Sequence, residues 1–365
     1  MSKTNDKVKS SEAFPFYSFE GTHYEIGEQY GESCRDLIKL HKKYALERLS
    51  KSIDISAHKN LEDAALEYRP FVIEYAPFFD KEIQGLAKGA DISLGEAYFL
   101  QLRAEIYNFF DTTDECTTFA VSGEVTKNGI PILGQNADLP SLYKEVGVVV
   151  ESKYNNSPKT LMLTPAGQIS YIGINDEGVA IGANFLECKG WKIGFPRYLL
   201  SKLALTKSNV KDAIKIIEGV NRASSRNLIM VDKANEMINL ETIPGEIAEI
   251  KDDNGILAHS NHFVSQKLLH EEGKEGEELK NSELRLDRTL SLLKQGSGVI
   301  DVERAIEIFR DRENFPHTLC REQGDFTESS DVITFASMIA EPTKGQLWIA
   351  IGPPSNYQYK KYSFS

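Results

Sequence analysis

Apolar and polar positions follow one pattern in the first part of the chain and another in the rest. Over residues 22–50 and 61–110, apolar side chains recur every three or four positions, which is the spacing of helices that bury one face. Pro70 and Pro77 interrupt the second stretch, and Gly89 marks an expected turn near Asp91. We therefore expect the N-terminal segment to consist of several helices.

From Cys116 onward, the pattern is typical of strands. Short runs rich in β-branched and aromatic residues are separated by Gly, Asn and Pro, as in a series of hairpins. The expected strands are 117–125, 130–138, 146–154, 159–167, 169–175, 178–186, 225–232, 236–243, 245–252, 255–263, 332–340 and 346–352. The expected helices between them are 196–206, 209–220, 281–294 and 301–310. The charge-rich stretch 270–283 is expected to be a solvated surface loop.

This order of elements predicts the α+β fold class. Helices, strands, helices and strands can stack as two central sheets covered by helices, which is a four-layer αββα sandwich with an N-terminal helical segment. The pattern by itself leaves other α+β arrangements open.

The composition is that of a globular protein with an acidic balance of charge. Of 365 residues, 41% are apolar and 26% are charged, and the net charge is −12. Nucleic acids and anionic membranes bind basic surfaces, so we expect neither as a partner. The N-terminus lacks the apolar stretch of a secretory signal, and no apolar run approaches the roughly 20 residues of a transmembrane helix. We therefore expect a soluble protein in the cytoplasm.

The spacing of the cysteines argues against two common kinds of cysteine site. Cys34, Cys116, Cys188 and Cys320 show neither CxxC pairing nor metal-ligand spacing. Free thiols in a reducing compartment are the simplest interpretation, and we expect no metal and no other cofactor.

Cys116 lies in the stretch DECTTFAV, directly after Asp114 and Glu115. Acidic neighbours raise the pKa of a thiol and weaken it as a nucleophile. A small, buried and inert cysteine is therefore one interpretation. The other is a nucleophile that becomes active once the acidic segment has been removed.

Three further stretches place polar residues inside or beside apolar strands. GQNAD brings Asp138 onto the strand next to Cys116, although Asn136 and Asp138 also suit a loop that bonds its own backbone. Asn184, in GINDEGVAIGANF, lies within an apolar strand, where its amide needs a partner. Arg321, in FPHTLCREQ, is either a surface residue or a ligand for a substrate carboxylate or carbonyl.

The stretch AHSNHF contains His259, Asn261 and His262 at the end of a strand. Two histidines can bind zinc, but no third carboxylate or thiol lies at a suitable spacing, so we expect no metal site. A Cys116–His259 dyad stays open as a catalytic pair. Against it, papain-type nucleophiles begin a helix, whereas Cys116 begins a strand.

Several of these stretches resemble one known family. DECTTF, GQNAD, GINDEGVAIGANF, SRNLIMVD and HSNHF occur in the order and approximate spacing of the N-terminal nucleophile hydrolases. The branch they resemble contains acyl-coenzyme A:6-aminopenicillanic acid acyltransferase and is peptidase family C45. FEGTHYEIGEQYGE, LCRE and TFASMIAEP extend the resemblance over about residues 17–353.

The resemblance implies a role for each matching residue. Cys116 corresponds to a nucleophile exposed by autocatalytic cleavage of the bond after Glu115. Asp138 corresponds to the carboxylate beside the nucleophile and its new amine, and Asn261 to the asparagine of the oxyanion hole. The remaining substrate or oxyanion candidates are Asn184, Gln135, Asn136, Arg321 and His259.

Cleavage before Cys116 would divide the chain into an α fragment, 1–115, and a β fragment, 116–365, which stay associated as one globular domain. The resemblance implies the αββα fold and the hydrolysis or transfer of an acyl group from a small amide or thioester, without a cofactor. This chain departs from the family in carrying Glu115 where a small residue often precedes the nucleophile. An uncleaved chain would instead be a binding protein or a thiol hydrolase that works through Cys116 and His259.

Overall fold

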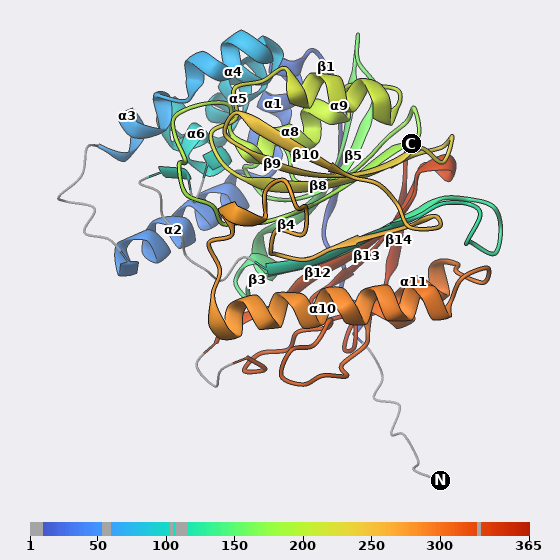
Figure 1. Cartoon of the computed structure of the whole chain (residues 1–365). Coiled ribbons are helices and arrows are strands. Elements are labelled where there is room, and N and C mark those ends of the chain that lie inside the picture. The colour runs from blue at the N-terminus through green and yellow to red at the C-terminus, as the bar shows by residue number, and fades with distance from the viewer. Residues whose placement is uncertain (1–9, 53–59, 103–104, 107–114, 327–329) are drawn as a thin grey trace.

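The computed structural model describes residues 10–52, 60–102, 105–106, 115–326 and 330–365. Two β-sheets stack face to face at the centre, and helices cover both outer faces (Figure 1). The N-terminal helices, α8 (Arg197–Ala204) and α9 (Val210–Glu218) lie over the larger sheet, whereas α10 (Gly276–Gln295) and α11 (Val302–Phe309) cover the smaller one. The αββα sandwich and the α+β class expected from the sequence are therefore confirmed.

The larger sheet has eight strands in the order β1-β4-β5-β6-β7-β8-β9-β10. Their bounds are β1 Phe16–Gly21, β4 Gly147–Tyr154, β5 Thr160–Pro165, β6 Ile172–Asn175, β7 Val179–Asn184, β8 Arg226–Asp232, β9 Met237–Ile243 and β10 Glu246–Ile250. β1 runs parallel to β4, and all other neighbours are antiparallel. The strand pattern predicted every member except β1. Through β1, the segment before Cys116 supplies an edge strand of this sheet.

The smaller sheet has six antiparallel strands in the order β11-β2-β3-β12-β13-β14. Their bounds are β2 Glu115–Val121, β3 Ile132–Pro140, β11 Ile256–His259, β12 Val332–Glu341, β13 Gln346–Ile351 and β14 Lys360–Ser363. The sequence predicted all of them except β14. β2 therefore lies inside the sheet, between β11 and β3. Cys116 pairs with β3, whereas the ladder with β11 ends at Thr118.

The N-terminal helices follow the breaks that the prolines predicted. Their bounds are α1 His23–Ser33, α2 Arg35–Ser52, α3 Leu61–Leu66, α4 Arg69–Tyr75, α5 Pro77–Ala90 and α6 Leu94–Leu102. The end of the helical stretch expected to reach residue 110 lies largely outside the described residues. Short elements complete the fold: α7 Tyr143–Val146 and the 3₁₀ helices η3 Leu269–Glu271 and η4 Pro342–Lys344.

The turn expected near Asp91 is confirmed, although Gly89 itself still lies inside α5. α1 and α5 pack so closely that a Cβ atom on Gly89 would lie 2.1 Å from the carbonyl oxygen of Glu28. The helix ends two residues later at Asp91, whose φ of 55° breaks it. The glycine is therefore explained by close helix packing rather than by a turn.

The expected surface loop over 270–283 is wrong in its second half. α10 begins at Gly276, and the side chains of Lys274, Asn281 and Ser282 are buried. The sequence pattern predicted that every charged side chain in this stretch is solvated, but Lys274 is buried and pairs with the carboxylate of Glu115. This segment proves to be part of the candidate site.

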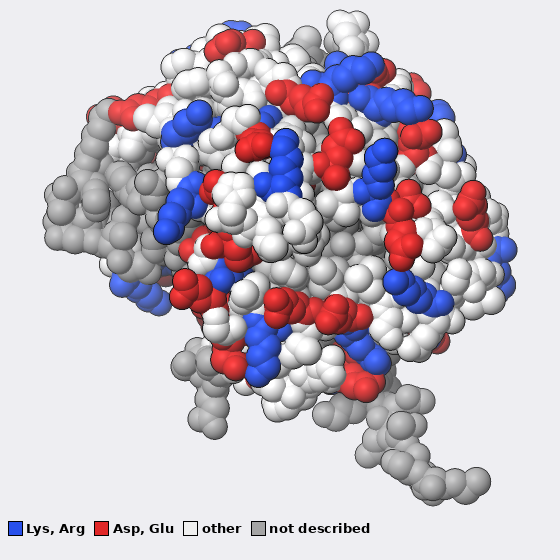
Figure 2. Space-filling model, in the orientation of Figure 1, with Lys and Arg blue, Asp and Glu red and all other residues white. Residues whose placement is uncertain are grey.

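The outer surface carries both signs of charge. On the face shown in Figure 2, Lys and Arg side chains alternate with Asp and Glu side chains over most of the area. Among the described residues, no helix has the length and apolar character that crossing a bilayer would need.

Candidate active site

Strand β2 sends the side chains of Cys116 and Glu115 to opposite faces of the smaller sheet, because side chains alternate along a strand. Cys116 shares the face of Thr118, whose hydroxyl donates to Oδ1 of Asn184 in the larger sheet at 2.6 Å. Glu115 shares the face of Thr117, which contacts α10 through Arg285. The thiol therefore lies between the two sheets, and the carboxylate lies between the smaller sheet and α10.

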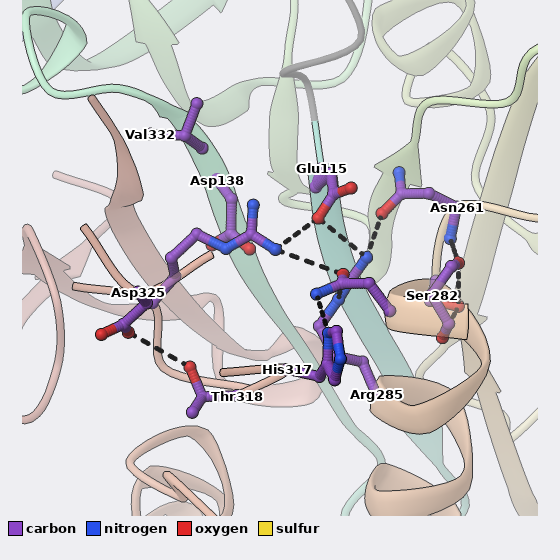
Figure 3. A network of polar contacts seen from close by, with 12 residues as sticks. Glu115, Asp138, Asn261, Ser282, Arg285, His317, Thr318, Asp325 and Val332 are labelled. Atoms are coloured by element: carbon purple, nitrogen blue, oxygen red, sulfur yellow. Dashed lines mark hydrogen bonds and ion pairs between the residues drawn. The ribbon is translucent and has the colours of Figure 1, made fainter. Parts of the chain in front are cut away.

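Glu115 lies in a buried pocket lined by three cations. Its Oε2 accepts hydrogen bonds from Arg321, at 2.5 Å, and from Arg285, at 3.3 Å (Figure 3). Its Oε1 lies 3.6 Å from Nζ of Lys274. All four side chains are at most 4% exposed. Burial opposes ionisation, but the three cations outweigh it and lower the pKa of Glu115 to about 2.

Asp138 lies directly opposite Glu115 in the β2–β3 ladder. Its Oδ1 accepts a hydrogen bond from the hydroxyl of Thr334 at 2.7 Å, and its Oδ2 has no donor among the described residues. Burial raises the pKa of Asp138 to about 6, against the opposing pull of Arg321 and Arg285. The predicted catalytic carboxylate is thus next to the bond between Glu115 and Cys116, and it titrates close to neutral pH.

Asn261 contacts the nitrogen of that bond. Its Oδ1 accepts hydrogen bonds from the backbone N–H of Cys116 at 2.7 Å and from Arg285 at 3.0 Å. Its Nδ2 donates to the carbonyl oxygen of Phe185 at 3.0 Å. The hydroxyl of Ser282, on α10, accepts from the backbone N–H of Asn261 at 2.7 Å and fixes the loop that carries it. The structure therefore brings Asn261 to Cys116, as the sequence predicted.

Arg285 organises the site and was missed by the sequence analysis. Nη1 donates to the carbonyl oxygen of Cys116 at 2.7 Å and to the hydroxyl of Thr117 at 2.8 Å, while Nη2 reaches Glu115 and Asn261 (Figure 3). Its Nε donates to Asn281, which also accepts from Arg321. A signal did exist in the sequence, since polar residues occupy the buried face of α10. They are Asn281, Ser282, Arg285 and Thr289.

Arg321 lies beside the bond that precedes Cys116 and is buried, so its interpretation as a surface residue is wrong. Its backbone N–H donates to Thr334, the same hydroxyl that donates to Asp138. The Nε atom of Arg321 is buried without a hydrogen-bond partner among the described residues. This arginine thus connects the two carboxylates of the site.

Gln135 and Asn136 have internal partners that explain them without a substrate. Gln135 exchanges two hydrogen bonds with the backbone of Ala183, at 2.9 and 2.8 Å, and so ties β3 to β7. Asn136 points to the opposite face, where its amide donates to the carbonyl oxygens of Phe309 and Leu319. We therefore assign both residues to packing between layers and withdraw them from the substrate group.

Asn184 is the last residue of β7 and contacts Thr118, which follows the nucleophile by two residues. Its Oδ1 accepts from Thr118, and its Nδ2 donates to Oδ1 of Asn227 at 3.0 Å. The amide is therefore satisfied inside the protein, as a buried amide must be.

His259 belongs to a separate buried contact. Its Nδ1 donates to the carbonyl oxygen of Ser260, and its Nε2 lies 2.9 Å from Oε1 of Glu241. Because both ring nitrogens are engaged, neither is available to take a proton from Cys116. Burial lowers the pKa of the neighbouring His262 to about 3, so that ring is neutral. The described residues contain no group of three or more potential ligands placed to hold a metal ion.

The sulfur side of Cys116 is lined by aromatic residues and an arginine that the sequence analysis also missed. Sγ lies 4.0 Å from the hydroxyl of Tyr171. The guanidinium of Arg226 lies 4.7 Å from the ring centre of Tyr198, and burial lowers its pKa. A strand residue in an apolar run, such as Arg226, carries no local sign that it faces a nucleophile.

Comparisons with known proteins show which family the chain belongs to. The sequence profile of the acyl-coenzyme A:6-aminopenicillanic acid acyl-transferase family matches residues 125–356. The 40 kDa form of acyl-coenzyme A:6-aminopenicillanic-acid-acyltransferase from Emericella nidulans is 27% identical over 343 residues, which cover 92% of each chain.

Two solved structures are similar more distantly. A mutant of conjugated bile acid hydrolase from Clostridium perfringens is 12% identical, with a TM-score of 0.45, over 68% of this chain and 97% of that one. A Caenorhabditis elegans orthologue of N-acylethanolamine-hydrolyzing acid amidase is 14% identical, also with a TM-score of 0.45, over 68% of this chain and 100% of that one.

Proposed function

Because the chain belongs to the acyl-coenzyme A:6-aminopenicillanic acid acyl-transferase family, we propose that it is a self-cleaving enzyme that uses Cys116 to hydrolyse or transfer the acyl group of a small amide or thioester. The family makes it an N-terminal nucleophile enzyme of the amide hydrolase and acyltransferase class. The observation that carries the proposal is the set of contacts around Cys116 and the peptide bond that precedes it. Asn261 binds the N–H of Cys116, Arg285 binds its carbonyl oxygen, and Asp138 lies opposite Glu115.

Self-cleavage starts with Sγ of Cys116 attacking the carbonyl carbon of Glu115. The bond between this carbon and the nitrogen of Cys116 then breaks, and the thiol proton ends on that nitrogen as part of a free α-amine. Glu115 is left as a thioester on Sγ. Water attacks the thioester, releases the carboxylate of Glu115 and restores the thiol.

The two fragments stay together in this proposal because they share one core. β1 of the 1–115 fragment pairs with β4 of the 116–365 fragment over six residues. Tyr30 of α1 also exchanges hydrogen bonds with the backbone of Gly167 and Gln168 across the same boundary. Cleavage therefore exposes the nucleophile without dividing the fold.

In the cleaved enzyme, the new amine of Cys116 serves as the base. An α-amine has a pKa of roughly 7.7–8.0, so a useful neutral fraction exists near pH 7. This amine takes the proton of the thiol, directly or through one water, and the thiolate attacks the substrate carbonyl. The bond from this carbonyl to the substrate's amine or thiol breaks, and the protonated α-amine gives its proton to that leaving group, so the acyl group stays on Sγ. Oδ1 of Asn261, which already accepts from this nitrogen, orients the amine. Asp138 supports the protonated form, and the acyl group passes from Sγ to water or to an amine.

Asn261 is also the proposed donor to the oxyanion. In the intact chain its Nδ2 is bound to the carbonyl oxygen of Phe185, so this donor becomes available only after local rearrangement. Removal of one oxyanion donor lowers the rate by about 10²–10³ in enzymes of this kind of chemistry.

The mass of freshly purified protein under denaturing conditions tests the proposal. Dividing 40.9 kDa in proportion to length predicts fragments of about 13 and 28 kDa for the wild type, with the larger beginning at Cys116. Cys116→Ala is the matched control and keeps the full mass. A wild type that also keeps its full mass contradicts self-cleavage and favours the binding protein that the sequence left open.

A further inference from the structure

The pocket around Glu115 and its occupant belong to different fragments. Lys274, Arg285 and Arg321, which line the pocket, all follow Cys116 in the sequence, whereas Glu115 precedes it. Cleavage therefore leaves the pocket with the fragment that carries the nucleophile. The carboxylate that fills it becomes part of a chain end that is free to leave.

Glu115 is also the first acyl group that Cys116 handles. In the thioester formed during self-cleavage, the acyl carbon of Glu115 is attached to Sγ. The acyl group of an external substrate is attached to the same sulfur in the acyl-enzyme. The pocket that holds the side chain of Glu115 is thus placed to hold the corresponding part of a substrate's acyl group.

An empty pocket of this composition favours an anion. Glu115 is the carboxylate that forms ion pairs with all three cations. Once it has left, the described carboxylates that still act on the cations lie beyond ion-pair distance: Asp138 for Arg285 and Arg321, Asp325 for Arg321, and Glu187 and Glu272 for Lys274. Nζ of Lys274 and Nε of Arg321 already lack hydrogen-bond partners among the described residues. Buried charges without partners are strongly destabilising, and a carboxylate that reaches them is bound by charge-assisted hydrogen bonds.

Building on the function proposed above, we propose that the cleaved enzyme prefers acyl groups that end in a carboxylate, and that Lys274, Arg285 and Arg321 bind this carboxylate. Glu115 sets the length, because three carbon atoms separate its carbonyl carbon from its carboxylate carbon. A glutaryl group has this spacing. The substrate class is therefore an amide or thioester of a dicarboxylic acid of about this length, or of an N-blocked glutamate.

Binding of glutarate is the deciding measurement, with its neutral diamide glutaramide as the comparison ligand. Calorimetric titration of the cleaved wild type is expected to show glutarate bound at least about tenfold more tightly than glutaramide, as expected for a charge-assisted contact. In uncleaved Cys116→Ala, Glu115 fills the pocket, and glutarate binding is expected to be lost. Equal binding of the two ligands to the cleaved enzyme, or equal binding of glutarate to both proteins, overturns the inference.

Hydrolysis provides a second test with a matched pair of lysine variants. The cleaved wild type is expected to hydrolyse glutaryl p-nitroanilide with a kcat/KM about 10- to 100-fold above that of the neutral 4-carbamoylbutyryl p-nitroanilide. Lys274→Met is expected to reduce this ratio mainly through the KM of the glutaryl substrate. Lys280→Met is the control, because Lys280 is exposed in the same segment of the chain and pairs with Glu277. A ratio near one in the wild type contradicts the inference.

The two proposals fail in different ways. A wild type that remains uncleaved contradicts the proposed function. It also contradicts the proposed carboxylate pocket, because Glu115 would then never leave it. A cleaved enzyme that hydrolyses the neutral anilide and shows no preference for a carboxylate, in binding or in kinetics, contradicts the pocket alone.

Discussion

The charge of Glu115 is expected to stabilise the uncleaved chain and to matter much less after cleavage. The perturbation is Glu115→Gln, which keeps the size of the side chain and one acceptor oxygen but removes the negative charge between three buried cations. The pKa of Glu115 is about 2, compared with an ordinary value of 4.5. A shift of this size corresponds to about 3 kcal/mol of stabilisation of the ionised form, within the range found on breaking buried ion pairs.

Urea unfolding at pH 7 measures this difference in two matched pairs. Between Cys116→Ala and the double variant Cys116→Ala/Glu115→Gln, the free energy of unfolding is expected to fall by about 3 kcal/mol. Between cleaved wild type and cleaved Glu115→Gln, the difference is expected to be below about 1 kcal/mol, because the residue has left its pocket. A loss of similar size in both pairs would show that Glu115 stays bound after cleavage. No loss in the uncleaved pair would refute the ionic account of the pocket.

Three further predictions concern the groups around this pocket. Arg285→Met is expected to slow self-cleavage about 100-fold, since it removes the side chain that holds the backbone of Cys116 and the amide of Asn261 in place beside the bond to be cleaved; a time course on newly made protein measures it. His259→Ala is expected to leave self-cleavage within about tenfold of wild type while lowering stability by roughly 3 kcal/mol, because Glu241 loses a buried partner; cleavage of less than one hundredth of the wild-type rate would show that His259 takes part in the cleavage reaction. Asp138 has a pKa raised by burial from 3.8 to about 6, so the folded uncleaved chain binds more protons than the unfolded chain between about pH 4 and 6. Its contribution to the free energy of unfolding therefore falls as pH rises through that window, and Asp138→Asn in the Cys116→Ala background is expected to remove this fall; an unchanged pH profile would contradict the assignment.

The family and the layer order were accessible from the sequence because both rest on local patterns. The change from helical to strand spacing at Cys116, and the order of strand blocks and helices, predicted the αββα sandwich that the structure has. The GQNAD motif predicted Asp138 as a neighbour of Cys116, and the resemblance to the family added Asn261. They are neighbours because antiparallel pairing and the loop after β11 bring these strand positions together.

The errors came from residues whose environment is set by distant parts of the chain. Lys274 belongs to a stretch that reads as a charged surface, and Arg285 follows it in a predicted helix; only the packing of α10 and the residues before it against β2 buries these two side chains. Gln135, Asn136 and His259 are polar residues in strands, and the sequence could not distinguish a substrate contact from a bond between two layers.

Hydrophobic spacing and short motifs along the chain determined the class of fold, the family and the position of the bond proposed to be cleaved, because each depends on residues that are close in sequence. Only the tertiary structure decided that Glu115, the acidic residue that made Cys116 look like a poor nucleophile, lies on the other face of the strand from the thiol. There it is neutralised by Lys274, Arg285 and Arg321, which are more than 150 residues away in sequence. The energy of a charge depends on its distance in space to other charges and on its burial, and the order of the residues alone specifies neither.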